Sequence, residues 1–300
     1  MAARRRSSVA SAIVVAACAI LAVPLAGAAA QADGVLRVCA DPNNLPLSHR
    51  NGEGYENRIA ELFARALGWR LEYTWYPQRM GFIRNTLRAR LDGGEGYKCD
   101  LVMGVPVGFE LAATTRPYYR STWTLVYARG HGLDVVRRPD DLLALPAARR
   151  RTLRFGAFIR TPPVDWLLRH QLLDQMVPYQ AQTGDPEQYP GEILEKDLLD
   201  GKLDVAFVWG PIAGYFAGRD PGHRLVVVPF LPDPAIRFDY QIAMGVRRGE
   251  PEWKNRVEQL IEQNRARIQN ILADYGVPQL DAAGRLIAVP AQKGKTTEPR

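Results

Sequence analysis

Eight polar and aromatic residues stand at or near the ends of expected strands and could form a binding site. Tyr, Trp and Arg side chains anchor protein interfaces and also line apolar ligand pockets. The candidates for a cleft that binds a ligand or a partner are Asp41, Asn44, Trp75, Arg79, Tyr118, Tyr119, Arg120 and Trp209. Simpler interpretations exist: the aromatic residues can pack in a core, the arginines can carry solvated charge, and the Asn- and Pro-rich loop of residues 41–48 can be turn chemistry.

Patterns of catalytic and metal-binding residues are missing from the sequence. The four histidines lack the spacing of zinc or copper ligands, and the stretch from Asp41 through Asn43 to Glu53 lacks the order of a calcium loop. Neither a nucleophile elbow nor a phosphate-binding glycine loop occurs. Asp41 and Glu56 are the only loose candidates for a carboxyl group with a raised pKa. We therefore predict a protein that is not an enzyme and uses neither a metal nor a cofactor.

The first 30 residues have the pattern of an export signal. Three arginines at residues 4–6 precede an apolar core at residues 13–25, and small alanines follow as cleavage sites. The core is too short to cross a bilayer, which takes about 20 apolar residues. Removing residues 1–30 lowers the formal net charge from +7 to +4, because three arginines and no acids are lost. We expect a periplasmic protein without stable membrane insertion, and the scattered charge disfavours nucleic-acid binding.

Cys39 and Cys99 remain after the export signal is removed. Two thiols in an oxidising compartment favour a disulfide, which would close a loop of about 60 residues and contribute about 4 kcal/mol in the chain-entropy model. The alternative is two buried thiols, because the Cα atoms must come within about 7 Å and a register mismatch between neighbouring strands would prevent this.

The N-terminal half of the mature chain alternates expected strands and helices. Residues 35–40 and 70–75 are expected strands, and the apolar residues between them recur at helical spacing until Gly68 ends the helix. A second helix is expected at residues 82–91 and a third strand at residues 100–105. This order predicts an α/β unit with a parallel sheet, in which ligands meet the carboxyl ends of the strands.

A second α/β unit follows a Pro- and Arg-rich connector. Its strands are expected at residues 155–158, 176–180, 204–208 and 225–228, and its helices at 163–173 and 192–199. Afterwards a strand near residues 240–244 returns to the first unit, and one apolar stripe from Trp253 to Leu272 predicts a helix that Gly276 and Pro278 end.

Two crossings of the chain, near residues 123–127 and 240–244, predict a two-stranded hinge between two lobes. Hinged closure around a ligand is the motion that such a design permits. The predicted division is an export signal at 1–30, lobe 1 at 33–125 plus 238–280, lobe 2 at 126–237 and a C-terminal tail at 281–300.

Five segments in order resemble the type II periplasmic solute-binding fold: GYENRIAELFARALG, KCDLVMG, RPYYRS, GKLDVAFVWGP and QIAMGVRRGEPEWKNRVEQLI. The combination of CADPNNLPLS, YTWYPQRMGFIRNTL, CDLVMGVPVG and TTRPYYRS is similar to the J-type accessory proteins of methanol oxidation systems, the MxaJ/XoxJ type. The resemblance implies a two-lobed α/β fold with a parallel-rich sheet in each lobe. It also implies a periplasmic partner, a PQQ-dependent methanol or alcohol dehydrogenase.

The chain departs from the amino-acid binders of this fold at two places. Those proteins carry an Arg before the Pro-Tyr segment, where counting back puts Gly108, and an Asp after the second-lobe strand, where Trp209 stands. An α-amino acid would therefore be desolvated without charge partners, at a cost of several kcal/mol.

Three functions follow from these observations, in order of preference. The first is a non-catalytic accessory protein that binds the dehydrogenase and assists its maturation or activation. The second is a solute-binding receptor of an ABC importer for an organic ligand that is not an amino acid. The third is an enzyme on the same fold, such as a periplasmic dehydratase, with a cleft carboxyl from Asp41 or Glu56. The fold by itself cannot decide among them, because one scaffold hosts many functions.

Overall fold

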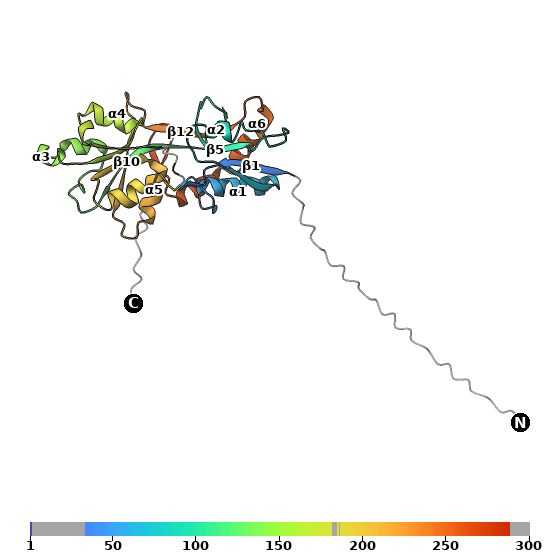
Figure 1. Ribbon diagram of the computed structural model, residues 1–300. Coiled ribbons are helices and arrows are strands. Elements are labelled where there is room, and N and C mark those ends of the chain that lie inside the picture. Colours follow the sequence, from blue (N-terminus) through green and yellow to red (C-terminus); the bar gives the residue numbers. More distant parts are fainter. Residues whose placement is uncertain (2–33, 182–184, 186, 289–300) are drawn as a thin grey trace. The chain divides into compact units, whose positions relative to one another are not determined.

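The structure is a computed structural model (Figure 1) that describes Met1 and residues 34–181, 185 and 187–288. The expected export signal lies outside the described residues, apart from Met1, and so does most of the expected C-terminal tail. Within the described part of the chain, no helix is both long and apolar enough to cross a membrane.

Strands from the first half of the chain form one half of a mixed sheet, which we call lobe 1. Its elements are β1 (Val35–Ala40), α1 (Tyr55–Leu67), β4 (Arg70–Trp75), α2 (Phe82–Asn85) and β5 (Leu101–Pro106). Strand β1 pairs in parallel with both β4 and β5, as the strand-helix alternation predicts. The loop after β1 forms a small hairpin of β2 (Asn43–Asn44) and β3 (Ser48–His49).

Glycines set both ends of α1. A Cβ at Gly54 would lie 2.1 Å from the carbonyl oxygen of Leu47, so only glycine fits where the helix begins. Gly68 has a φ of 68° in the left-handed region and ends the helix, as predicted. The next helix is shorter than the expected residues 82–91. Thr86 explains this, because its hydroxyl donates to the carbonyl oxygen of Phe82 at 2.6 Å and competes with the helical pattern.

The second half of the sheet, which we call lobe 2, has helices on both faces. Its helical segments are η1 (Pro139–Ala144), α3 (Ala147–Arg150), α4 (Pro162–Arg169), η2 (Leu173–Gln175), the π-helical η3 (Ile193–Leu198) and α5 (Gly210–Arg219). Its strands are β8 (Phe155–Phe158), β9 (Met176–Tyr179), β10 (Val205–Trp209) and β11 (Leu225–Pro229). Figure 1 shows α4 and α5 on opposite sides of β10.

Alternate residues of β10 explain this layering. Phe207 packs in a core cluster with Trp166 of α4, whereas Val208 packs in a second cluster with Phe216 of α5. Successive side chains of a strand point to opposite faces, so a strand covered on both faces is apolar at every position. Helix α5 at Gly210–Arg219 is not expected from the sequence, because that segment is apolar on most of its surface and has little helical periodicity.

The hinge consists of two antiparallel strands, β7 (Tyr119–Ala128) and β12 (Asp239–Val246). They pair from Tyr119 with Ile242 to Thr122 with Asp239, a few residues earlier in β7 than expected. The reason is the length of β7, whose remaining residues pair with β10 and β11. Strand β12 continues into lobe 1, where it pairs with β5 and the short β6 (Ala113–Thr114). The two-stranded hinge is therefore confirmed.

The C-terminal segment returns to lobe 1. The single expected helix is two, α6 (Pro251–Gln263) and α7 (Arg265–Asp274), because the chain breaks at Asn264. Their apolar residues, including Val257, Ile261 and Leu272, join α1 and β1 in one core. A short antiparallel pair, β13 (Gln279–Leu280) and β14 (Leu286–Ala288), follows.

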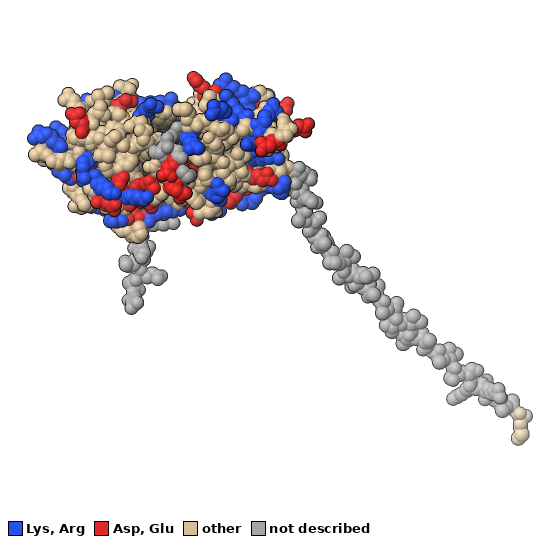
Figure 2. Space-filling model, viewed as in Figure 1, with Lys and Arg blue, Asp and Glu red and all other residues tan. Residues whose placement is uncertain are grey.

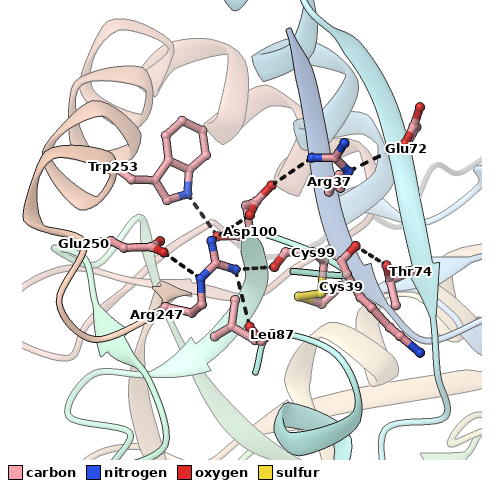
Figure 3. A network of polar contacts seen from close by, with 11 residues as sticks. Arg37, Cys39, Glu72, Thr74, Leu87, Cys99, Asp100, Arg247, Glu250 and Trp253 are labelled. Atoms are coloured by element: carbon pink, nitrogen blue, oxygen red, sulfur yellow. Dashed lines mark hydrogen bonds and ion pairs between the residues drawn. A yellow bond between two sulfur atoms is a disulfide. The ribbon is translucent and has the colours of Figure 1, made fainter. Parts of the chain in front are cut away.

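A polar network closes the outer edge of lobe 1 (Figure 3). Arg247, at the end of β12, forms ion pairs of 2.7 Å with both Asp100 and Glu250 and donates to the carbonyl oxygen of Cys99. Beside it, Cys39 and Cys99 form a disulfide with their Cα atoms 5.4 Å apart. The predicted bond is confirmed, although the strand register pairs Cys39 with Val102 and not with Cys99. The chain just before β5 approaches Cys39 from the side of β4, where the Thr74 hydroxyl donates to the carbonyl oxygen of Lys98 at 2.5 Å.

Candidate functional site

A cavity of about 430 Å³ lies between the two lobes, and we call it the cleft. Lobe 1 contributes the loop after β1 and the turn after β4, and lobe 2 contributes strand ends, η3 and the start of α5. The parallel neighbours β8, β9 and β10 end at the same edge of the sheet, which is where such sheets bind ligands. The volume lies within the range of small-molecule sites, about 300–1,000 Å³.

Lobe 1 presents a polar wall that Asp41 organises. The Asp41 carboxylate accepts hydrogen bonds from the backbone N–H of Asn43 at 2.8 Å and of Gln78 at 2.5 Å. The Asn44 side chain donates to Oε1 of Gln78 at 2.7 Å. This turn chemistry joins the loop after β1 to the turn after β4, so that two segments far apart in sequence form one surface.

Lobe 2 presents an aromatic wall. Trp209 at the end of β10 meets Trp123 of β7 edge to face, with ring centroids 6.0 Å apart. Phe158 and Tyr179, the last residues of β8 and β9, have ring centroids 5.9 Å apart. The Tyr179 hydroxyl donates to Asp197 at 2.6 Å, and this hydrogen bond holds the pKa of the Asp197 carboxyl below its usual value. The wall offers broad apolar faces with one polar edge.

The charges that line the cleft are mostly negative. Four carboxylates and two cations give a formal net charge of −2: Asp41, Asp185, Glu192 and Asp197 against Arg79 and Lys196. Lys196 is also paired with Glu192 at 2.9 Å. The cleft therefore favours a neutral or positively charged group over an anion.

The loop of residues 41–48 reaches from lobe 1 to lobe 2. The Asn43 side chain donates to the carbonyl oxygen of Glu187 at 3.1 Å, a contact between residues 144 positions apart. Leu45 and Leu47 pack against the core cluster that contains Val208 and Phe216 of lobe 2. The lobes thus touch beside the cleft as well as at the hinge.

Four of the eight candidate residues line the cleft and four do not. The lining residues are Asp41, Asn44, Arg79 and Trp209. Tyr118 and Tyr119 are buried in the lobe 1 core, where the Tyr119 hydroxyl is 2.9 Å from that of Tyr55. Trp75 is half-buried and stacks on Tyr73, with ring centroids 4.6 Å apart.

Arg120, the remaining candidate, lies at the hinge. Its guanidinium pairs with Asp239 of β12 at 2.5 Å and donates to the carbonyl oxygens of Asp281 and Ala282 at 3.2 and 2.8 Å. Beside it, Ser121 donates to the carbonyl oxygen of Pro278 at 2.6 Å. Arg120 therefore ties both hinge strands to the C-terminal segment and is part of the hinge rather than of the cleft wall.

Glu56, the second carboxyl candidate for a catalytic role, is buried in α1 and is not among the residues that line the cleft. Its Oε1 has no hydrogen-bond partner among the described residues and lies so close to Gly104 that a Cβ there would be 2.3 Å away. Burial raises the pKa of Glu56 to about 8, and the charge of Asp41 adds to the shift. The carboxyl is therefore mostly protonated at neutral pH.

Several residues that line the cleft are not predicted from the sequence, among them Asn43, Gln78, Trp123, Phe158 and Tyr179. For Phe158 and Tyr179 a signal exists, because both lie at the carboxyl ends of expected strands. For Gln78 there is none, since only its hydrogen bonds to Asp41 and Asn44 bring it to the cleft. Within the described part of the chain, no three His, Cys, Asp or Glu residues gather as metal ligands would.

The chain is similar to several known proteins over most of its length. It is 34% identical to the periplasmic binding protein XoxJ from Methylobacterium extorquens AM1, with a TM-score of 0.65 over 82% of this chain and 99% of XoxJ. MxaJ from Methlophaga aminisulfidivorans MPT is 23% identical, with a TM-score of 0.67 over 82% of this chain and 100% of MxaJ. Protein MoxJ from Methylorubrum extorquens is 27% identical over 82% of each chain. No protein-family model matches the sequence.

Proposed function

Because this chain belongs to the MxaJ/XoxJ type of periplasmic binding protein, we propose that it is a periplasmic accessory protein of methanol oxidation. In this proposal it binds a PQQ-dependent methanol or alcohol dehydrogenase through the cleft and assists the maturation or activation of that enzyme. It catalyses no reaction itself.

The aromatic wall of the cleft is the observation that carries this proposal. Trp209 stands where amino-acid binders of this fold hold an Asp, and it lies beside Trp123 and Tyr240. An indole cannot pair with the ammonium group of an amino acid as a carboxylate would, whereas Trp and Tyr faces are what anchor a protein segment. A polar wall opposite an aromatic one suits an extended segment that presents a different kind of side chain to each lobe.

Gly108 adds nothing to this argument. It is exposed on the loop after β5 and is not among the residues that line the cleft. The loss of an amino-acid clamp at that position therefore cannot be argued from the structure. Two features count against a zwitterionic ligand: the indole of Trp209 in place of an Asp, and the excess of carboxylates in the cleft, which would repel the carboxylate group of such a ligand.

Affinity purification of the tagged protein from its native periplasm tests the proposal. We expect the dehydrogenase to copurify with the wild-type protein and to be lost with Trp209→Ala, which removes a face of the aromatic wall. Trp69→Ala is the matched control, because Trp69 is also half-buried but stacks on Trp253 at the far side of lobe 1. Absence of the dehydrogenase from the wild-type eluate would refute the proposal.

The alternative is a receptor for a small organic solute, and the cleft volume of about 430 Å³, which is typical of small-molecule sites, favours it. A ligand that binds only the native state raises the melting temperature by mass action. A thermal-shift screen of periplasmic metabolites therefore separates the two functions, since one strongly stabilising metabolite would support the receptor.

A further inference from the structure

Three exposed arginines of lobe 1 lie in α2 or on segments that contact the loop after β5, and this loop carries two exposed apolar side chains. We call it the arginine patch and define it as Arg84, Arg88, Val107, Leu111 and Arg248. Val107 is 39% exposed and Leu111 48% exposed, on the loop that follows β5. Figure 2 shows Lys and Arg gathered on the surface where Figure 1 places α2 and α6.

Hydrogen bonds hold the arginine patch together. Arg88 donates to the carbonyl oxygen of Leu111 at 2.7 Å, and Arg248 donates to that of the adjacent Glu110 at 2.5 Å. Two guanidinium groups from distant segments therefore converge on the same loop. Arg84 lies in α2, four residues before Arg88 in the chain. Beneath the loop, Phe109 packs against a core cluster that contains Ala112, which anchors it to the lobe.

The positive charge of the arginine patch is not neutralised by ion pairs. Among the described residues, Arg84, Arg88 and Arg248 form no salt bridge, although most other arginines of the lobe do, for example Arg37 and Arg247. Glu110, whose carbonyl oxygen accepts from Arg248, is exposed, and its carboxylate offsets one of the three positive charges, which leaves a formal charge of +2. Like charges held side by side repel one another, and an acidic partner would relieve this repulsion.

We propose that the arginine patch is a second docking surface, which binds an acidic, partly apolar surface of the dehydrogenase. This inference rests on the proposed function and adds to the cleft a separate electrostatic contact. Guanidinium groups fixed by carbonyl hydrogen bonds are suited to the paired oxygens of carboxylates. The exposed side chains of Val107 and Leu111 on the same loop add apolar area beside these charges, and protein interfaces combine both.

A protein partner fits the arginine patch better than a lipid surface. Val107 and Leu111 are 39% and 48% exposed, and the loop is held at each of them. The backbone N–H of Val107 donates to the carbonyl oxygen of Gln241 at 2.9 Å and the carbonyl oxygen of Leu111 accepts from Arg88, so neither side chain can insert deeply into a bilayer. Arg88 and Arg248 are also held against backbone rather than extended from a helix face, unlike the arginines of the basic amphipathic helices that bind membranes.

The test measures how fast the purified dehydrogenase associates with the wild-type protein and with Arg84→Glu/Arg88→Glu. We expect association about 10-fold slower for this variant near 0.1 M salt, because charges at an interface rim act mainly on the association rate. In about 1 M salt, where the Debye length falls from about 10 Å to 3 Å, the two rates should converge. Arg151→Glu/Arg267→Glu is the matched control, since both arginines are exposed and the change in net charge is equal.

Each outcome decides the proposal. A wild-type rate and salt dependence in Arg84→Glu/Arg88→Glu would overturn the docking surface and leave the proposed function intact. Equal slowing by the control variant would also overturn it, because the effect would then come from net charge. Binding of the wild-type protein to phosphatidylglycerol vesicles, lost in the variant while complex formation is unchanged, would assign the patch to a membrane. If no dehydrogenase binds at all, the proposed function falls as well.

Discussion

Replacing Glu56 by Gln should remove a pH dependence of stability that the fold creates. The Glu56 carboxyl is buried without a hydrogen-bond partner among the described residues, and burial, aided by Asp41, raises its pKa from 4.5 to about 8. The folded protein therefore binds this proton more tightly than the unfolded chain does. The contribution of this proton to the free energy of unfolding is fully present below pH 4.5 and is lost as the pH rises to about 8.

The magnitude follows from proton linkage. Stability should fall by about 1.4 kcal/mol for each pH unit between the two pKa values, which amounts to about 3.5 kcal/mol from pH 5 to pH 8. Gln is similar in shape and does not titrate. Glu56→Gln should therefore match the wild type near pH 5 and be the more stable protein by a few kcal/mol at pH 8.

Urea unfolding followed by tryptophan fluorescence at four pH values between 5 and 8 measures this difference. Other titrating groups, including His170, whose pKa is lowered by burial, contribute equally to both proteins and cancel in the comparison. Glu53→Gln provides a control at an exposed carboxyl next to α1. If wild type and Glu56→Gln lose the same stability between pH 5 and 8, the assignment of a neutral buried carboxyl is wrong.

Three further changes test the frame around the cleft, each by urea unfolding. Cys39→Ser/Cys99→Ser opens a loop with a sequence separation of 60 and should lower the free energy of unfolding by about 4 kcal/mol. As a control, adding a reductant to this double variant should not change its stability, because no disulfide is left to break. Arg120→Ala leaves Asp239 unpaired at the hinge and should cost about 2–3 kcal/mol, with Arg120→Lys in between. Arg247→Met removes the centre of a network that is mostly buried and should cost about 3 kcal/mol; a loss below 1 kcal/mol would count against the network.

Local patterns predict most of the elements correctly because their causes lie within a few residues. The helix before Gly68 follows from apolar spacing and a left-handed glycine, and the strands at residues 35–40 and 70–75 follow from alternation and β-branched content. Two helix ends are predicted wrongly, because apolar spacing does not mark them. The helix break at Asn264 and the early end of α2 at Asn85 depend on side chains that bond the backbone, which apolar spacing does not reveal.

The candidate site divides in the same way. Trp209 and Asp41 can be placed from sequence because each follows a strand whose carboxyl end must face the cleft. Tyr118 and Tyr119 cannot, since the same aromatic residues fit a core or a cleft equally well, and burial in lobe 1 decides the matter. The sequence predicts Arg120 as a cation of the cleft, but in the structure it pairs with Asp239 of the hinge, 119 positions away in the chain.

The sequence by itself determined the export pattern, the alternation of strands and helices, the family resemblance and the pair of cysteines available to bond. All of these depend on residue types and short spacings. Only the tertiary structure decided which wall of the cleft is aromatic, and that Arg88 and Arg248 meet at one loop. It also decided that Glu56 Oε1 is buried beside Gly104 with no hydrogen-bond partner in the described part of the chain. Such outcomes depend on contacts between residues far apart in the chain, whose geometry exists only after the lobes have folded.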